Sequence, residues 1–190
     1  MATLGASDVD DRSCFDSWRK VRDELQLGRS RRITRMSFGF EGQGSPTWRA
    51  NGHIDRLASQ RADVALLSYF ADGSPPLCPD LSTNLAGMYA DIDTIRAARS
   101  DTVIILLMMW RMSPAQEAIT FPNLMGVYRT NYPTVASNRP DVGILNLYDA
   151  SGLPADHPSE WGLDPIHPLY GWWRRVAIPM AVERLGPLFV

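Results

Sequence analysis

Residues 102–109 read TVIILLMM, an unbroken apolar run near the middle of the chain. A run this short and this apolar is typical of a β-strand that is buried on both faces. Strands of that kind occur in parallel sheets whose two faces are covered by helices. The run therefore predicts an α/β fold, and the segments on both sides of it carry the matching pattern.

Strand-like and helix-like segments alternate along the rest of the chain. We expect further strands at residues 2–4, 33–40, 64–70 and 142–148, and amphipathic helices at residues 17–27, 48–60, 85–95, 124–136 and 169–185. Pro133 is expected to bend or end the helix at 124–136, and Pro179 to kink the helix at 169–185. Because strands that alternate with helices join through right-handed crossovers, we predict a flavodoxin-like three-layer α/β/α sandwich with a central parallel sheet of about five strands.

The composition is that of an ordinary globular protein, and we expect residues 1–190 to form a single domain. The 190 residues are 45% hydrophobic, and the net charge of −2 gives no electrostatic reason to expect nucleic acid or an anionic membrane as a partner. The longest apolar run is the size of a strand, so the sequence predicts no membrane span.

The ends and the cysteines of the chain carry weaker signals. The first residues lack the charged and apolar regions of a signal peptide, which predicts a cytoplasmic protein or a part of a larger assembly. Cys14 and Cys78 have the spacing of neither a disulfide framework nor a metal site, so we expect free buried thiols.

The clearest chemical signal is the pair Asp164 and His167, just ahead of the last expected helix. A carboxylate three residues before a histidine can accept a hydrogen bond from one ring nitrogen and hold the tautomer, which leaves the other nitrogen to act as a base. The simpler interpretation is a histidine in a proline-rich surface turn. His157 is a rival base, but its setting is that of a loop residue.

A nucleophile and oxyanion donors are available at the same edge of the predicted sheet. Ser7 stands in a strand-to-helix turn, where its hydroxyl would be exposed and its N–H could face an anion. Gly42 lies in a glycine-rich turn, and its lack of a Cβ allows a second backbone N–H to approach closely. The set follows the chain order Ser, Asp, His.

These residues resemble the blocks of the SGNH (GDSL-type) esterase and lipase superfamily along nearly the whole chain. The similar stretches are Gly5-Ala6-Ser7, residues 39–44, residues 62–67 and residues 164–171. The resemblance implies that Ser7 is the nucleophile, His167 the general base and Asp164 the residue that orients it. It also implies that the N–H groups of Ser7 and Gly42 form part of the oxyanion hole, that no metal or cofactor is needed, and that the substrate is a small-molecule, glycan or lipid ester.

The resemblance fails at the family's third block, which here is Tyr69-Phe70-Ala71-Asp72. Ala71 stands where the family has an asparagine that donates to the oxyanion, and losing one such donor typically costs about 3–4 kcal/mol of transition-state stabilisation. Asn84, Asn123 or a water are the candidate replacements. Asp8 directly after Ser7 would also repel a developing oxyanion, unless it points away or binds a cation.

Two functions from different classes remain open on the sequence. The first is a serine esterase or lipase that acts on a carboxylic ester through an acyl-enzyme. The alternative is a catalytically impaired SGNH-like module that serves binding or assembly in a larger complex, such as a virion or a surface protein. A phosphatase of the Asp-x-Asp type at Asp8-Val9-Asp10 is disfavoured, because that class needs a later lysine and Lys20 is the only one present.

Three further features have structural interpretations. His53 lies in the first half of the helix expected at 48–60 and is predicted to be solvated, and the basic residues 29–35 are predicted to form a solvated turn. Trp161, Trp172 and Trp173 could line a substrate groove, but we favour packing in the core.

Overall fold

The computed structural model describes residues 1–5, 17–29, 33–34, 36–39, 43–152, 156 and 166–189. Within these residues a five-stranded sheet has the order β2-β1-β3-β4-β5, and every pair of neighbouring strands is parallel. The strands are β1 (Ala2–Gly5), β2 (Met36–Gly39), β3 (Val64–Leu67), β4 (Val103–Met108) and β5 (Val142–Asn146). The predicted parallel sheet is therefore confirmed.

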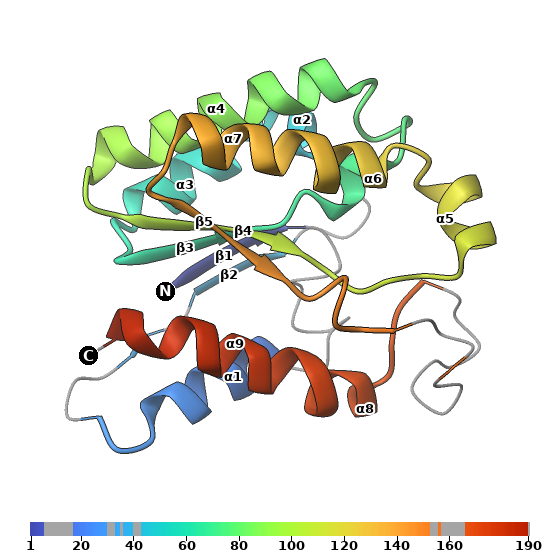
Figure 1. Ribbon diagram of the computed structural model, residues 1–190. Helices are drawn as coiled ribbons and strands as arrows, with labels where there is room; N and C mark the ends of the chain where they lie inside the picture. The colour runs from blue at the N-terminus through green and yellow to red at the C-terminus, as the bar shows by residue number, and fades with distance from the viewer. Residues whose placement is uncertain are drawn as a thin grey trace.

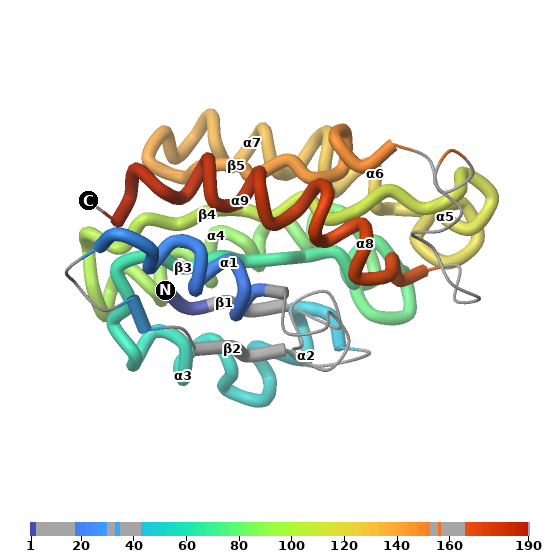
Figure 2. Tube along the Cα trace, turned by 90° about the horizontal axis from the view of Figure 1, so that it is seen from below, coloured from blue at the N-terminus to red at the C-terminus, as the bar shows by residue number. Residues whose placement is uncertain are grey.

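Helices cover both faces of the sheet, which gives the three predicted layers (Figure 1). One face carries α1 (Ser17–Gln26), α8 (Tyr170–Trp172) and α9 (Ile178–Leu185). The other carries α2 (Ser45–Ala50), α3 (His53–Ser59), α4 (Leu81–Ala98), α6 (Leu124–Gly126) and α7 (Tyr132–Asn138). Figure 2, which looks from below, shows α1 and α9 side by side across the sheet, with the strands in the same order.

The central strands are apolar because helices cover both faces of the sheet, which buries β3 fully and most of β4. All four residues of β3 are buried, and β4 pairs with β3 on one side and with β5 on the other. Burial of a branched aliphatic side chain contributes about 1.5–3 kcal/mol, so the middle of the sheet contributes much of the stability of the core.

Local backbone requirements account for several departures from the predicted elements. The expected helix at 48–60 is two helices, α2 and α3, which are separated by a left-handed Gly52. Helix α1 ends at Gln26, so Leu27 lies in a turn and is exposed instead of joining the apolar face. Helix α5 (Pro114–Thr120), which begins at the N-cap Ser113, was not predicted.

Each of the two long helices with an internal proline carries a π-helical segment just before it. The segment η2 (Val127–Asn131) precedes Pro133 in α7, and η5 (Trp173–Ala177) precedes Pro179 in α9. A proline lacks the N–H that an α-helix uses and its ring collides with the carbonyl four residues earlier. The wider π turn accommodates the proline, so the chain stays helical past Pro133, where a bend or an end was expected, and past Pro179, where a kink was expected.

No helix in the described part of the chain is long and apolar enough to cross a membrane.

Candidate active site

Because all five strands are parallel, their carboxyl ends meet at one edge of the sheet, where sites occur in folds of this kind. At this edge β3 leads into the short helix η1 (Phe70–Gly73), and β4 leads to Trp110. Ser7, Gly42 and Asp164 lie outside the described residues, as do Asp8 and His157. Their roles stay predictions.

His167 is half-buried on the segment that enters α8. Its imidazole ring packs against the indole of Trp110, with the ring centroids 5.9 Å apart and the planes at 57°. Trp110 follows β4, so the predicted base lies beside the carboxyl end of a central strand.

Trp110 is the centre of an aromatic cluster that joins the third block to the last helix. Its ring also contacts Phe70 at 5.2 Å and Trp172 and Trp173 at 5.9 Å each. Trp172 and Trp173 are fully buried, which confirms their predicted place in the core; Trp161 lies outside the described residues. His167 and η1 therefore contact the same buried indole.

Asp72, the last residue of the third block, fixes the turn after β3. Its buried carboxylate accepts hydrogen bonds from the Ser45 N–H at 2.6 Å, from the Ser45 hydroxyl and from Asn84 Nδ2 at 2.7 Å. Burial raises the pKa of Asp72, and these donors partly oppose that rise. A Cβ on the neighbouring Gly44 would overlap the Leu77 carbonyl, so this close approach requires glycine.

A second buried carboxylate, Asp91, is connected to the Asp72 hydrogen bonds through Arg49 and Ser45. Arg49 donates to Asp91 and to the Ser45 hydroxyl, each at 2.9 Å, and the Tyr69 hydroxyl donates to Asp91 at 2.9 Å. Burial raises the pKa of Asp91 to about 6, although Arg49 opposes it. Helices α2 and α4 and the turn after β3 are thereby joined through one set of buried polar groups.

Comparison with solved structures identifies the fold. No family model and no curated protein matches the chain. Among solved structures, the lipase/acylhydrolase from Enterococcus faecalis is similar with a TM-score of 0.76 at 13% identity, covering 98% of this chain and 94% of that one. A catalytic mutant of an acetylxylan esterase from Geobacillus stearothermophilus is similar with a TM-score of 0.74 at 13% identity, covering 97% and 93%. A GDSL-like lipase from Bacteroides thetaiotaomicron has a TM-score of 0.67 at 11% identity, covering 98% and 86%.

The chain has the SGNH (GDSL-type) hydrolase fold. The likeness spans nearly the whole chain, and the fold predicted from the sequence is confirmed.

Within this SGNH fold, Ala71 lies buried in η1 at the place predicted for the third block. Of the two amides considered as replacements for the missing asparagine, Asn84 is disfavoured. Its Nδ2 donates to Asp72, its Oδ1 accepts from Asn131 at 2.8 Å, and it is fully buried. Asn84 therefore holds buried partners and presents no exposed donor to a bound substrate.

Asn123 remains available. Its backbone N–H donates to the Gly73 carbonyl at 2.9 Å, which fixes this residue against the end of η1. Its side chain is half-buried and makes no hydrogen bond to the described part of the chain. Asn123 is thus an amide beside the third block with its donors unused.

The polar groups around Asp91 were missed in the sequence, although a signal was present. Met88, Asp91, Ile92 and Ile95 follow the spacing of a single helix face, and a carboxylate on an otherwise apolar face indicates a buried partner. The partners themselves, Arg49 and Tyr69, come from distant parts of the chain.

The predicted solvation of His53 is wrong. His53 is buried at the start of α3, and burial lowers the pKa of its imidazole. Cys78 is a buried free thiol, as predicted, and burial raises its pKa to about 12; Cys14 lies outside the described residues. Across the described ranges, no group of His, Cys, Asp and Glu has the arrangement of a metal site.

Proposed function

We propose that this protein hydrolyses carboxylic esters through an acyl-enzyme on Ser7. The observation that carries the proposal is the contact between His167 and Trp110 at the carboxyl edge of an SGNH-fold sheet, on the same aromatic cluster as the third block. The similar structures include a lipase/acylhydrolase and an acetylxylan esterase, which favours a small-molecule or glycan ester as the substrate.

In the proposed reaction, His167 takes the proton of the Ser7 hydroxyl as the oxygen attacks the ester carbonyl. The tetrahedral intermediate collapses, and the alcohol leaves with the proton that His167 returns to it. Water, deprotonated by His167, then attacks the acyl-enzyme; the acyl–Oγ bond breaks, His167 returns the proton to the Ser7 oxygen, and the carboxylic acid is released. Asp164 holds the imidazole in the tautomer that both steps need.

The oxyanion of each tetrahedral intermediate needs donors that are already in place. We assign two to the backbone N–H groups of Ser7 and Gly42, as the family resemblance implies. The third donor is missing at Ala71, and we assign its place to the side chain of Asn123, which is held beside the end of η1. Such donors are worth about 3–4 kcal/mol each when they are aimed at the developing charge.

The proposal is tested by the turnover of p-nitrophenyl acetate. We expect Ser7→Ala and His167→Ala each to lower kcat by about 10³-fold or more, since the triad residues act as a unit. Ser59→Ala, at an exposed serine that ends α3, is the matched control and should keep the wild-type rate. Equal rates for wild type and Ser7→Ala would refute the assignment of the nucleophile and return the chain to a binding or assembly role.

A further inference from the structure

A cavity lies near the carboxyl ends of β4 and β5, and the catalytic proposal does not use it. It has a volume of about 240 Å³, and its lining includes Arg111, Met112, Glu117, Arg129, Tyr148 and Asp149. Arg111 directly follows Trp110, whose indole contacts His167. The cavity is therefore adjacent to the candidate active site along the same edge of the sheet.

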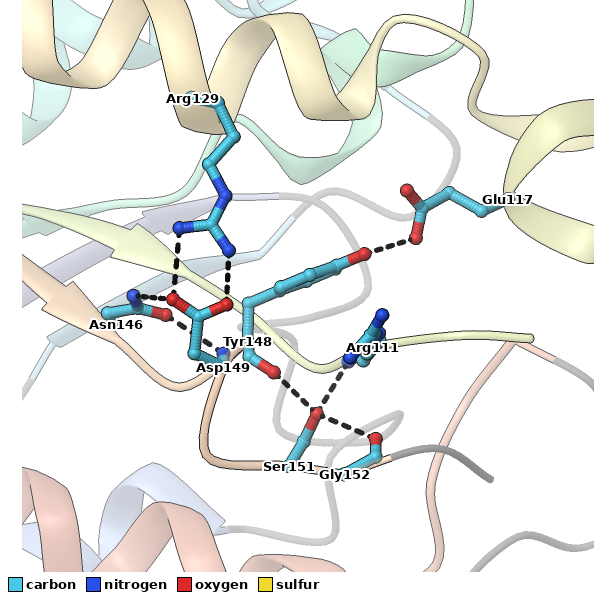
Figure 3. Close-up of polar contacts among 8 residues, drawn as sticks. All are labelled: Arg111, Glu117, Arg129, Asn146, Tyr148, Asp149, Ser151 and Gly152. Atoms are coloured by element: carbon cyan, nitrogen blue, oxygen red, sulfur yellow. Dashed lines mark hydrogen bonds and ion pairs between the residues drawn. The ribbon is translucent and has the colours of Figure 1, made fainter. Parts of the chain in front are cut away.

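Two arginines flank the ring of Tyr148 in this cavity, and Figure 3 shows them on opposite sides of it. The guanidinium carbons of Arg111 and Arg129 lie 5.6 and 5.9 Å from the ring centroid. The Tyr148 hydroxyl donates to Glu117 Oε2 at 2.7 Å. Burial, followed by Glu117, raises the pKa of Tyr148, so the phenol stays protonated as a neutral donor.

Arg129 has its charge neutralised within the protein. It forms a two-pronged ion pair with Asp149, with one bond at 2.9 Å, and Asp149 also accepts from Asn146 Nδ2 at 2.6 Å. These donors lower the pKa of Asp149, so the pair stays ionised. Neither partner needs a ligand to satisfy its charge.

Arg111 differs from Arg129 in this respect. It is half-buried and lines the cavity, yet no carboxylate of the described residues forms an ion pair with its guanidinium. Its backbone is fixed, since its N–H donates to Ser151 Oγ at 3.0 Å and that hydroxyl donates to the Tyr148 carbonyl at 2.8 Å (Figure 3). A partly buried cation on a fixed backbone, with no ion-pair partner among the described residues, suits an anionic ligand.

We propose that Arg111 binds an anionic group of the substrate, a carboxylate or a phosphate, in the cavity beside Tyr148. This inference rests on the proposed esterase function, because the group is part of the ester that Ser7 attacks. Met112 and the neighbouring Pro114 and Met125 supply an apolar side for the chain that carries the anion.

The spacing between neighbouring strands gives the approximate length of such a substrate. Neighbouring strands are about 4.8 Å apart, so the ends of β4 and β5 stand about 10 and 14 Å from that of β1 along the strand order. An ester whose far end carries the anion at about that distance from the carbonyl would reach both sites. A short anionic ester would not.

The test uses p-nitrophenyl monoesters of succinic, adipic, suberic and sebacic acid, each with its far carboxylate free or methyl-capped. For the longer acids, we expect wild-type kcat/KM to favour the free carboxylate by about 10- to 100-fold, the usual effect of a charge-assisted hydrogen bond. Arg111→Met should remove this preference and leave the capped esters unchanged. An ester of the same length that ends in a phosphate in place of the carboxylate tests which of the two anions Arg111 binds more tightly.

Direct binding separates this inference from the catalytic proposal. Suberate should bind to wild type by calorimetry, and its affinity should fall by about 10-fold or more in Arg111→Met. Glu117→Gln keeps an acceptor for Tyr148 but removes a nearby negative charge, so it should tighten suberate binding. Arg184→Met, at an exposed arginine in α9, is the matched control.

The outcomes are distinct. Suberate binding that is equal in wild type and Arg111→Met, or a carboxylate preference that survives the substitution, overturns the inference. If no ester is hydrolysed, capped or free, then the catalytic proposal fails while suberate binding still decides the role of the cavity.

Discussion

At the residue scale, Trp110 is the side chain on which the candidate site depends most. It contacts His167, Phe70, Trp172 and Trp173 and is almost fully buried. Aromatic pairs are worth about 0.5–1.5 kcal/mol each beyond the area that they bury. Trp110 therefore serves stability and, through His167, the geometry of the proposed base.

We expect Trp110→Ala to lower the free energy of unfolding by about 3–5 kcal/mol, because it leaves a large cavity among packed rings. Urea denaturation measures this. Leu188→Ala, at a partly exposed side chain near the C-terminus, is the control and should change stability by less than about 1 kcal/mol. A similarly small loss in Trp110→Ala would show that the cluster does not hold the site together.

The assignment of the third oxyanion donor to Asn123 also belongs to single residues. Asn123→Ala should lower kcat on p-nitrophenyl acetate by about 100-fold or more, with little change in the melting temperature. In that background, Ala71→Asn restores the family's own donor and should recover part of the loss. An unchanged kcat in Asn123→Ala would leave water as the remaining donor.

At the scale of elements, buried polar groups join α2 and α4 to the turn after β3, in addition to the packing of Trp48 on Tyr69. Arg49, Asp91 and Tyr69 come from three separate segments, and each contributes a bond that the others need. Breaking one partner of a buried ion pair typically costs about 3–5 kcal/mol, since the other charge is left buried. The position of the third block depends on these bonds through Ser45 and Asp72.

At Gly87 in α4, the close contact with Arg49 outweighs helix propensity. Alanine is favoured over glycine in a helix by about 1 kcal/mol, so Gly87→Ala would stabilise an isolated helix. In the protein, a Cβ at Gly87 would overlap the Arg49 guanidinium and force it away from Asp91. We expect a net loss of about 1–3 kcal/mol by urea denaturation. The loss should shrink in an Asp91→Asn background; equal losses in both backgrounds would mean that Arg49 moves freely.

The pKa of about 6 for Asp91 makes part of the stability depend on pH. The folded state binds this proton more tightly than the unfolded state, whose aspartates titrate near pH 3.9, so ionisation between about pH 4 and 6 destabilises the fold. Relative to Asp91→Asn, the free energy of unfolding of wild type should fall by about 2–3 kcal/mol as pH rises through that window. A difference between the two proteins that does not vary with pH would contradict this titration.

At the scale of the whole molecule, the fold could be predicted because its main signal is local. An apolar run such as residues 102–109 and alternating segments around it require a parallel sheet with helices on both faces. The breaks within helices were harder to predict. The left-handed Gly52 and the π turns before Pro133 and Pro179 depend on how each helix packs on the sheet as well as on the sequence near them.

The candidate site could be predicted only in part. The spacing of Asp164 and His167 pointed to a base, and His167 does lie at the carboxyl edge of the sheet. The cavity at Arg111 and the bonds around Asp91 could not be predicted, because residues such as Arg129 and Asp149 pair across the fold without any spacing that marks them.

The most direct measurement is the mass of the protein after treatment with a fluorophosphonate, with the modified residue mapped by peptide sequencing. An active SGNH hydrolase should gain one adduct on Ser7, and His167→Ala should label far more slowly, since the serine then lacks its base. Well-folded protein that stays unmodified at high probe concentration, or an adduct on another serine, would contradict the proposed function.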